Sequence, residues 1–388
     1  MKLIALLHSA LAAALLCATP LTTAAEVVVG QIAAFTGPLA PTGTHMRAGA
    51  QLYFDAVNAD GGIHGATIRL ISRDDGYKSE ETVRLAREMI REAQPLAFIG
   101  FVGTGNVEAI LEQKVLSEAG IPLLAVRSGA ETLVRKNDPF LFMTRASYAE
   151  EIEKITEQYV TTGYTRFAVL YQDDAFGQGA LVSAEQAIGK AGGVLVAKGA
   201  YEKNTTNVGD AVKSIAAAKP QAVIMLANTA ASAEFLKRSR EAGNLAQFVA
   251  LSVTDAAQIV QRIGADKAEG LALTQVVPDP NSRTVTLIRE IQGNFAKFKP
   301  QEVTLNHTFV EGYLGAKVLG EALRTTGTTA LYVTHDQDEA FALADRVGVM
   351  ANGRLLQLDA PELLWRRPAS REVADFLGYE PFIAPDVA

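Results

Sequence analysis

Polar or aromatic side chains recur in this chain directly after short apolar runs. The residues at these positions are Thr36, Thr104, Ser128, Phe176, Asn228 and Thr254. The apolar runs have the length and branched composition of buried strands. Ligands of open α/β sheets bind just beyond the carboxyl ends of strands, where the free N–H groups of helix N-termini favour anions. The pattern therefore predicts a binding site for a small ligand with an anionic group.

Arg127 is the candidate for the strongest contact with such a group. It follows the apolar run 121–126 and precedes Ser128. An arginine at the end of a strand can donate two parallel hydrogen bonds to one carboxylate. Other interpretations stay open, because a lone arginine is usually solvated and serine at such a place usually caps a helix. Gly103 and Gly105 could serve only a tight turn, and Phe176 taken singly is more typical of a core.

No catalytic or metal-binding arrangement is recognisable. The acidic pairs Asp74-Asp75 and Asp173-Asp174 fall in turns, where adjacent carboxylates are usually solvated. None of the five histidines has a partner at metal-binding spacing. No G-x-S-x-G nucleophile elbow is present. We therefore expect a protein that is not an enzyme and that has no metal or cofactor.

Composition limits the classes of partner. The chain has 388 residues, of which 48% are hydrophobic, so it can form about two domains with substantial cores. Its formal net charge is −7 and it contains no block of basic residues, which argues against a nucleic-acid partner.

Residues 1–25 have the features of a cleavable signal peptide. Lys2 supplies the positive start, an apolar stretch follows, and residues 23–25 are small. The apolar stretch is too short to favour a permanent membrane span. Cys17, the only cysteine, would leave with this peptide, and Leu16 before it does not fit a lipid-anchor motif. A mature chain without thiols fits export to the periplasm.

Strand and helix patterns alternate along the chain. A strand at 27–34, a helix closed by Asp60-Gly61-Gly62 and a strand at 67–71 form a βαβ unit. Further strands are predicted at 95–99, 121–126, 166–171, 193–198, 221–226 and 248–252. Helices are predicted between them, one of them capped by Ser79 and one beginning at Asn106. This alternation predicts an α/β fold of parallel sheets covered by helices on both faces.

The string FTGPLAPTGTHMRAGAQLYFDAVNADGGIHGATIRLISRDDGYKSEETVRLA resembles the opening of leucine/isoleucine/valine-binding-type (type 1) periplasmic solute-binding proteins, which serve ABC importers. The resemblance extends from Glu26 to about Gly327. It implies two doubly wound lobes with a hinge, and hence lobe one at 26–144, lobe two at 145–273 and a return to lobe one at 274–327.

The resemblance also implies a set of ligand contacts. The predicted set is Phe35, Thr36, Gly103, Thr104, Gly105, Arg127, Ser128 and Gly129 from lobe one and Phe176, Asn228, Thr254 and Asp255 from lobe two. Branched-chain amino-acid binders place an acidic residue in lobe two to hold the ammonium group. Here Thr254 occupies that position and Asp255 is adjacent. Either Asp255 takes the role or the ligand lacks an amine.

A different resemblance begins near Thr329. The string ALYVTHDQDEAFALADRVGVMANGRLLQLDAPELLWRRPASREVADFLG resembles the end of an ABC-transporter ATPase domain, so residues 328–388 form a separate C-terminal fragment. His335 would be the switch-loop histidine that contacts the γ-phosphate in that family. The chain has no G-x-x-x-x-G-K-[ST] loop to hold the phosphates, so His335 is interpreted as vestigial.

The combined prediction is a monomeric periplasmic solute-binding component of an ABC importer. Its lobes would close on a small carboxylate-bearing solute, either an amino acid or an organic acid, and deliver it to a membrane permease. Two alternatives remain. One is a ligand-sensing receptor module of the same fold, because fold alone does not decide function. The other is an ATP-binding subunit, which the missing phosphate loop disfavours.

Overall fold

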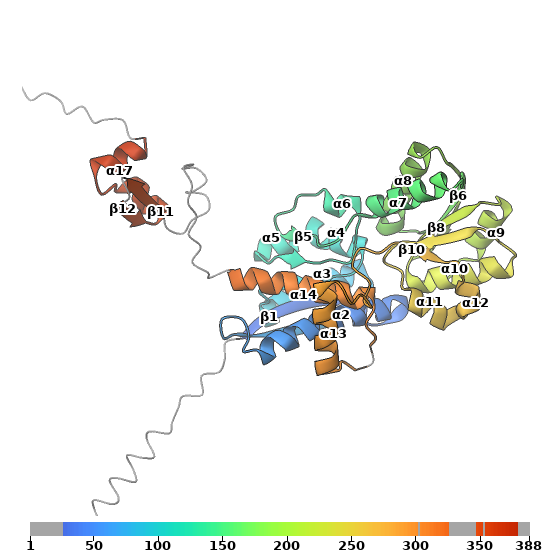
Figure 1. Ribbon diagram of the computed structural model, residues 1–388, viewed down its shortest axis with the longest axis horizontal. Helices are drawn as coiled ribbons and strands as arrows, with labels where there is room; N and C mark the ends of the chain where they lie inside the picture. Colours follow the sequence, from blue (N-terminus) through green and yellow to red (C-terminus); the bar gives the residue numbers. More distant parts are fainter. Residues whose placement is uncertain (1–25, 302, 326–346, 352–353, 379–388) are drawn as a thin grey trace, which may run out of the picture. The chain divides into compact units, whose positions relative to one another are not determined.

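The computed structural model describes residues 26–301, 303–325, 347–351 and 354–378. The described chain divides into two compact units at the junction of Thr326 and Gly327. The first unit contains two five-stranded sheets, and each sheet is the centre of one lobe (Figure 1). The predicted signal peptide and His335 lie outside the described residues.

The sheet of lobe one is entirely parallel and has the order β2-β1-β3-β4-β5. Its strands are β1 (Glu26–Ala33), β2 (Thr67–Asp74), β3 (Ala97–Ile99), β4 (Leu123–Leu124) and β5 (Leu141–Phe142). The order reverses between β1 and β3, which is the kind of switch point beside which ligands of doubly wound sheets bind.

Helices cover both faces of this sheet. They are η1 (Gly37–Leu39), α2 (Ala40–Ala59), α3 (Ser79–Ala93), α4 (Thr104–Glu112), α5 (Val115–Ala119), α6 (Glu131–Val134), α13 (Thr286–Phe298) and α14 (His307–Thr325). The apolar core on one face contains side chains of α2, α13 and α14. The core on the other face contains side chains of α3, α4 and α5. The late helices α13 and α14 therefore pack in the core of lobe one.

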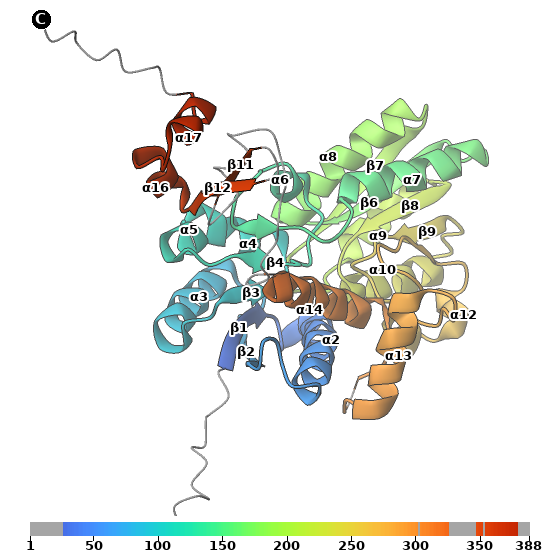
Figure 2. The same ribbon diagram turned by 60° about the vertical axis from the view of Figure 1, so that its left-hand side comes forward.

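Lobe two repeats the plan. Its strands are β6 (Arg166–Gln172), β7 (Val194–Tyr201), β8 (Ala222–Leu226), β9 (Gln247–Ala250) and β10 (Ala272–Leu273), and its helices are α7 (Tyr148–Thr161), α8 (Ala175–Lys190), α9 (Gly209–Ala217), α10 (Thr229–Glu241), α11 (Ala256–Ile263) and α12 (Ala265–Ala268). The parallel strands run β10-β9-β8-β6-β7, which is the order of lobe one read from the other edge. Helices α7 and α8 lie on one side of the sheet and α10 on the other (Figure 2).

The apolar residues of β8 show why this sheet forms. All five residues of the strand are buried, and they alternate between the cores on the two faces of the sheet. A continuous apolar run of this kind is expected of a parallel strand with helices on both faces. The predicted two-lobed α/β fold is thus confirmed by the sheet topology.

Several predicted boundaries were wrong for local backbone reasons. The strand predicted at 121–126 is reduced to Leu123–Leu124, because Ala125 has a positive φ of 55° that ends it. The helix predicted from Asn106 begins at Thr104 and is divided by Lys114, also at positive φ. Ser79 is the first helical residue of α3 and caps nothing.

The second unit is small. Strands β11 (Val347–Ala351) and β12 (Arg354–Asp359) pair antiparallel, and helices α16 (Pro361–Arg366) and α17 (Arg371–Phe376) follow. Its core consists of Val347, Val349, Leu364, Val373 and Leu377. Among the described residues of the whole chain, no helix combines the length and apolarity needed to cross a bilayer.

Candidate functional site

A small cavity, partly open to solvent, lies between the two lobes. It is lined by Leu39, Thr42, Tyr77, Val102, Gly103, Thr104, Arg127, Tyr148, Gln172, Phe176, Asn228 and Val253. Most of these residues follow the carboxyl end of a strand, in lobe one after β1 to β4 and in lobe two after β6, β8 and β9. The cavity therefore lies where doubly wound sheets bind their ligands, and both lobes contribute to it.

Lobe one presents a turn and the start of a helix to the cavity. Gly103 has a φ of 105° and precedes the first residue of α4, Thr104. A side chain at position 103 would overlap the ring of Tyr77, so the turn requires glycine. The Thr104 and Ser128 hydroxyl groups are hydrogen-bonded at 2.8 Å. No side chain caps α4, so the N–H groups of its first turn are available to a ligand.

Lobe two presents a connected set of amide and phenol groups. The Gln172 Nε2 group donates to the Tyr77 hydroxyl at 3.1 Å and to Asp174 Oδ2 at 2.8 Å. The Gln172 Oε1 atom accepts from the Tyr201 hydroxyl at 2.9 Å and from Asn228 Nδ2 at 3.2 Å. Asn228 also caps α10, because its Oδ1 atom accepts the N–H of Ala231 at 3.1 Å. These bonds hold the two amides in fixed orientations.

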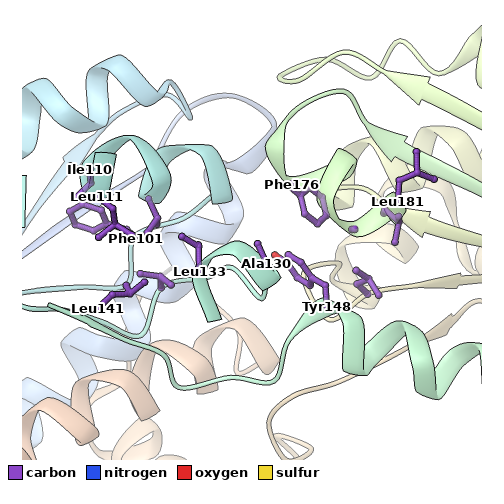
Figure 3. Close-up of a cluster of buried hydrophobic side chains, with 14 of the residues drawn as sticks. Phe101, Ile110, Leu111, Ala130, Leu133, Leu141, Tyr148, Phe176 and Leu181 are labelled. Carbon is purple, nitrogen blue, oxygen red and sulfur yellow. The ribbon is translucent and has the colours of Figure 1, made fainter. Parts of the chain in front are cut away.

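Two aromatic rings of lobe two form one wall of the cavity. The rings of Tyr148 and Phe176 are 5.1 Å apart between centroids and are both buried. Figure 3 shows Tyr148 and Phe176 facing each other, with Ala130 beside them. They belong to one apolar cluster that continues from lobe one into lobe two. Burial raises the pKa of Tyr77 well above its ordinary value, so its phenol remains a neutral hydroxyl group.

Four buried charged side chains stand beside the cavity. Arg127 donates to Glu311 at 2.5 Å, and Arg145 lies 3.3 Å from the other oxygen of Glu311. Arg145 also pairs with Glu151 at 3.1 Å. These side chains are between 2% and 8% exposed. Two arginines and two glutamates sum to zero charge, and such pairing is what makes the burial of charges tolerable.

This charge network joins the two lobes. Glu311 belongs to α14 of lobe one, Glu151 to α7 of lobe two, and Arg145 to the segment that crosses between them. The N–H of Ser252 in lobe two donates to Glu151 at 2.9 Å, and Arg127 donates to the carbonyl oxygen of Ser252 at 3.2 Å. Sequence reasoning found only Arg127 of this network, because its other members belong to no local motif.

The structure brings five of the twelve predicted contacts to the cavity: Gly103, Thr104, Arg127, Phe176 and Asn228. Seven do not line it: Phe35, Thr36, Gly105, Ser128, Gly129, Thr254 and Asp255. Ser128 is hydrogen-bonded to Thr104, which does line the cavity. Asp255 instead caps α11 and accepts from Asn306 at 2.7 Å. Thr254 donates to the carbonyl oxygen of Ala227 at 3.2 Å.

Seven lining residues were not predicted: Leu39, Thr42, Tyr77, Val102, Tyr148, Gln172 and Val253. Gln172 could have been found from the sequence, because it directly follows the predicted strand 166–171. In the structure it is the last residue of β6 and is fully buried. Tyr148 could not, because it is the first residue of a helix and reaches the cavity only through the crossing between lobes.

Two lobes of equal strand order with a cavity between their carboxyl ends define a two-lobed solute-binding protein. The chain belongs to the periplasmic binding protein family, whose model matches residues 26–336. The family consists of binding proteins rather than enzymes. Within the described residues, no group of three or more histidine, cysteine, aspartate or glutamate side chains could hold a metal ion.

Solved structures support the assignment. A substrate-binding periplasmic protein from Ralstonia solanacearum is 40% identical, with a TM-score of 0.75, over 78% of this chain and 85% of that one. A possible leucine/isoleucine/valine-binding protein from Rhodopirellula baltica SH 1 is 28% identical, with a TM-score of 0.73, over 89% and 92%. The chain is thus a solute-binding protein of an ABC transporter, similar in structure to leucine/isoleucine/valine-binding proteins.

A second similarity is of a different kind. Over 70 residues, or 18% of this chain, it is 53% identical to the Fe(3+) ions import ATP-binding protein FbpC of Streptomyces avermitilis. The chain spans about a fifth of the length of such curated relatives. This similarity agrees with the predicted resemblance of the C-terminal fragment to ABC ATPases.

Proposed function

We propose that this chain is exported to the periplasm, binds a small carboxylate-bearing solute in the cavity between its lobes, and delivers it to the membrane permease of an ABC importer. The single observation that carries the proposal is the composition of the cavity wall. Residues from both lobes contribute to it, so occupancy of the cavity favours lobe closure. The arginine side chain in that wall matches the charge of a carboxylate.

The polar residues of the cavity wall are suited to bind the carboxylate of a solute, and the apolar residues are suited to contact the remainder of the molecule. Arg127 and Thr104 stand together on the lobe-one side, beside the uncapped start of α4. Leu39, Val102 and Phe176 supply apolar surface. Solute sites commonly combine such a wall with a few fixed polar groups that set orientation. The proposed solute is therefore a small acid with an apolar body.

A thermal-shift screen of the purified chain against small carboxylates tests binding. A solute that binds only the folded state raises the melting temperature. Thr104→Val removes one hydroxyl at nearly constant volume, and we expect it to weaken binding of the selected acid about tenfold. Thr165→Val, at an exposed position outside the cavity, is the matched control. Equal affinities of the two variants would place the site elsewhere.

Delivery and export need separate measurements. Cells that lack this chain should lose uptake of the selected acid, and the wild-type chain should restore uptake better than Thr104→Val does. Mass spectrometry of the chain recovered from the periplasm should find a mature N-terminus at Glu26. Retention of the chain in the cytoplasm would contradict the proposed location.

A further inference from the structure

We infer that the solute is a carboxylate that carries no ammonium group, so that the site excludes amino acids. This inference rests on the proposed function, because it names the class of acid held in the same cavity. It follows from three features of the cavity. No acidic residue that the structure describes lines it, the side-chain amide oxygens in its wall already accept hydrogen bonds within the protein, and its charged lining residue is an arginine.

No acidic side chain is among the lining residues of the described chain. The nearby carboxylates have other partners. Asp75 accepts from the Thr82 hydroxyl at 2.7 Å and from the N–H of Tyr77 at 2.8 Å. Asp174 caps α8 and accepts from Gln172 at 2.8 Å. Asp255, the predicted partner of an amine, is bound to Asn306 and does not line the cavity.

The amide oxygens of the wall are also engaged. Gln172 Oε1 already accepts two hydrogen bonds, from Tyr201 and from Asn228. Asn228 Oδ1 accepts the N–H that begins the capped helix α10. An ammonium group needs three acceptors, and a buried charged group left without them carries a large desolvation cost. The side-chain amides of the lobe-two wall therefore provide few free hydrogen-bond acceptors for an ammonium group.

The positive charge of the site faces the cavity. Arg127 lines it, whereas its partner Glu311 does not. The Nε group of Arg127 is buried and has no hydrogen-bond partner, and the residue as a whole is 3% exposed. A carboxylate can accept hydrogen bonds from an arginine and from the uncapped N–H groups of α4, which an ammonium group cannot do. An ammonium group would instead meet hydrogen-bond donors, and no acceptors, at these groups.

The other residues of the cavity wall determine which carbon skeleton the solute can have. Tyr77, Tyr148 and Phe176 contribute rings, and Leu39 and Val253 contribute aliphatic surface. Such a surface suits an aromatic or branched aliphatic skeleton, because burial of apolar area drives its transfer from water. The solute class is therefore an aryl-alkanoic or branched alkanoic acid.

Isothermal titration calorimetry with matched pairs tests the inference. Each pair shares a skeleton and a carboxylate and differs by one ammonium group, namely 3-phenylpropanoate against phenylalanine and 4-methylpentanoate against leucine. The amine-free acid should bind more tightly by a factor on the order of 100, because the amino acid leaves its ammonium group without acceptors. An amino acid that binds as tightly as its amine-free partner would overturn the inference and leave the proposed function intact.

If no carboxylate of either kind binds, the proposed function fails and the inference fails with it. A charge-introducing variant gives a further readout on the same site. Val253→Asp puts a carboxylate in the lobe-two wall, and Val253→Asn is its control of equal size without charge. The aspartate variant should bind the amine-free acid more weakly. The ratio of its affinities for the amine-free acid and the amino acid should fall from about 100 by at least tenfold, whereas the asparagine variant should keep the wild-type ratio. An unchanged ratio in a folded Val253→Asp variant would count against the inference.

Discussion

The Nη1 atom of Arg127 lies 2.5 Å from the Oε1 atom of Glu311, a residue 184 positions further along the chain. The pair joins the end of β4 to α14, and Arg145 shares the same glutamate. Arg127 is therefore both a wall residue of the cavity and a member of the network that crosses between the lobes. Its side chain is held in place by these contacts within the protein.

Replacing Glu311 by glutamine should destabilise the protein strongly. The change leaves two buried arginines with one carboxylate between them, and breaking a buried pair typically costs about 3–5 kcal/mol. Urea unfolding measures the loss. The matched control is Glu157→Gln, whose exposed pair with Lys154 should contribute nothing measurable. Similar unfolding midpoints for the two variants would mean that the network contributes little to stability.

Two glycine-to-alanine substitutions should change the free energy of unfolding in opposite directions. Helices α2 and α14 pack closely (Figures 1 and 2), and a Cβ atom at Gly312 would overlap the carbonyl oxygen of Met46. Gly312→Ala should therefore destabilise by about 1–3 kcal/mol. Gly189→Ala lies on the exposed side of α8 with nothing near its new methyl group, and it should stabilise by about 0.5 kcal/mol. Chemical denaturation distinguishes these signs, and stabilisation by Gly312→Ala would refute the close approach.

Tyr77→Phe should weaken solute binding without unfolding the protein. The Tyr77 hydroxyl accepts from Gln172 of lobe two, and the nearby Asn204 donates to the carbonyl oxygen of Gly76 at 3.2 Å. These contacts hold the lobes together at the cavity. Losing one hydrogen bond of about 1 kcal/mol should reduce affinity about fivefold. Calorimetry measures the affinity, and the control Tyr171→Phe, outside the cavity, should retain it.

Stability should fall as the pH falls below about 6.5, partly because of His307. Burial lowers the pKa of His307 below its ordinary value, and the charge of Arg127 adds to this effect against the opposing pull of nearby carboxylates. Below the unfolded pKa, the unfolded chain binds more protons at this site than the folded chain does. The contribution is therefore present above 6.5 and is lost as the pH falls through the folded pKa.

The free energy of unfolding, measured between pH 5 and 8, tests this dependence. His307→Gln should flatten the profile, whereas the control His64→Gln, at an exposed position, should leave it unchanged. A profile of His307→Gln that is parallel to the wild type would assign the pH dependence to other groups.

Local pattern was sufficient to predict most of the elements, but it missed very short strands and some of the limits. The run 222–226 is apolar throughout, so its assignment as a buried strand was confirmed. Strand β5 and the early end of β4 were missed, because two-residue strands carry almost no periodicity. The start of α4 at Thr104 depends on the positive φ of Gly103, which propensity alone does not reveal.

The sequence by itself determined the alternation of strands and helices, and with it the parallel sheets and the end of each sheet at which a ligand binds. Gly103, Thr104, Arg127, Phe176 and Asn228 were predictable on that basis, since a strand end is a local feature. Only the tertiary structure decided that Glu311 and Arg145 would surround Arg127 and that Asp255 would turn away to cap a helix. These partnerships join residues far apart in the chain, and their geometry depends on how two separately folded lobes meet.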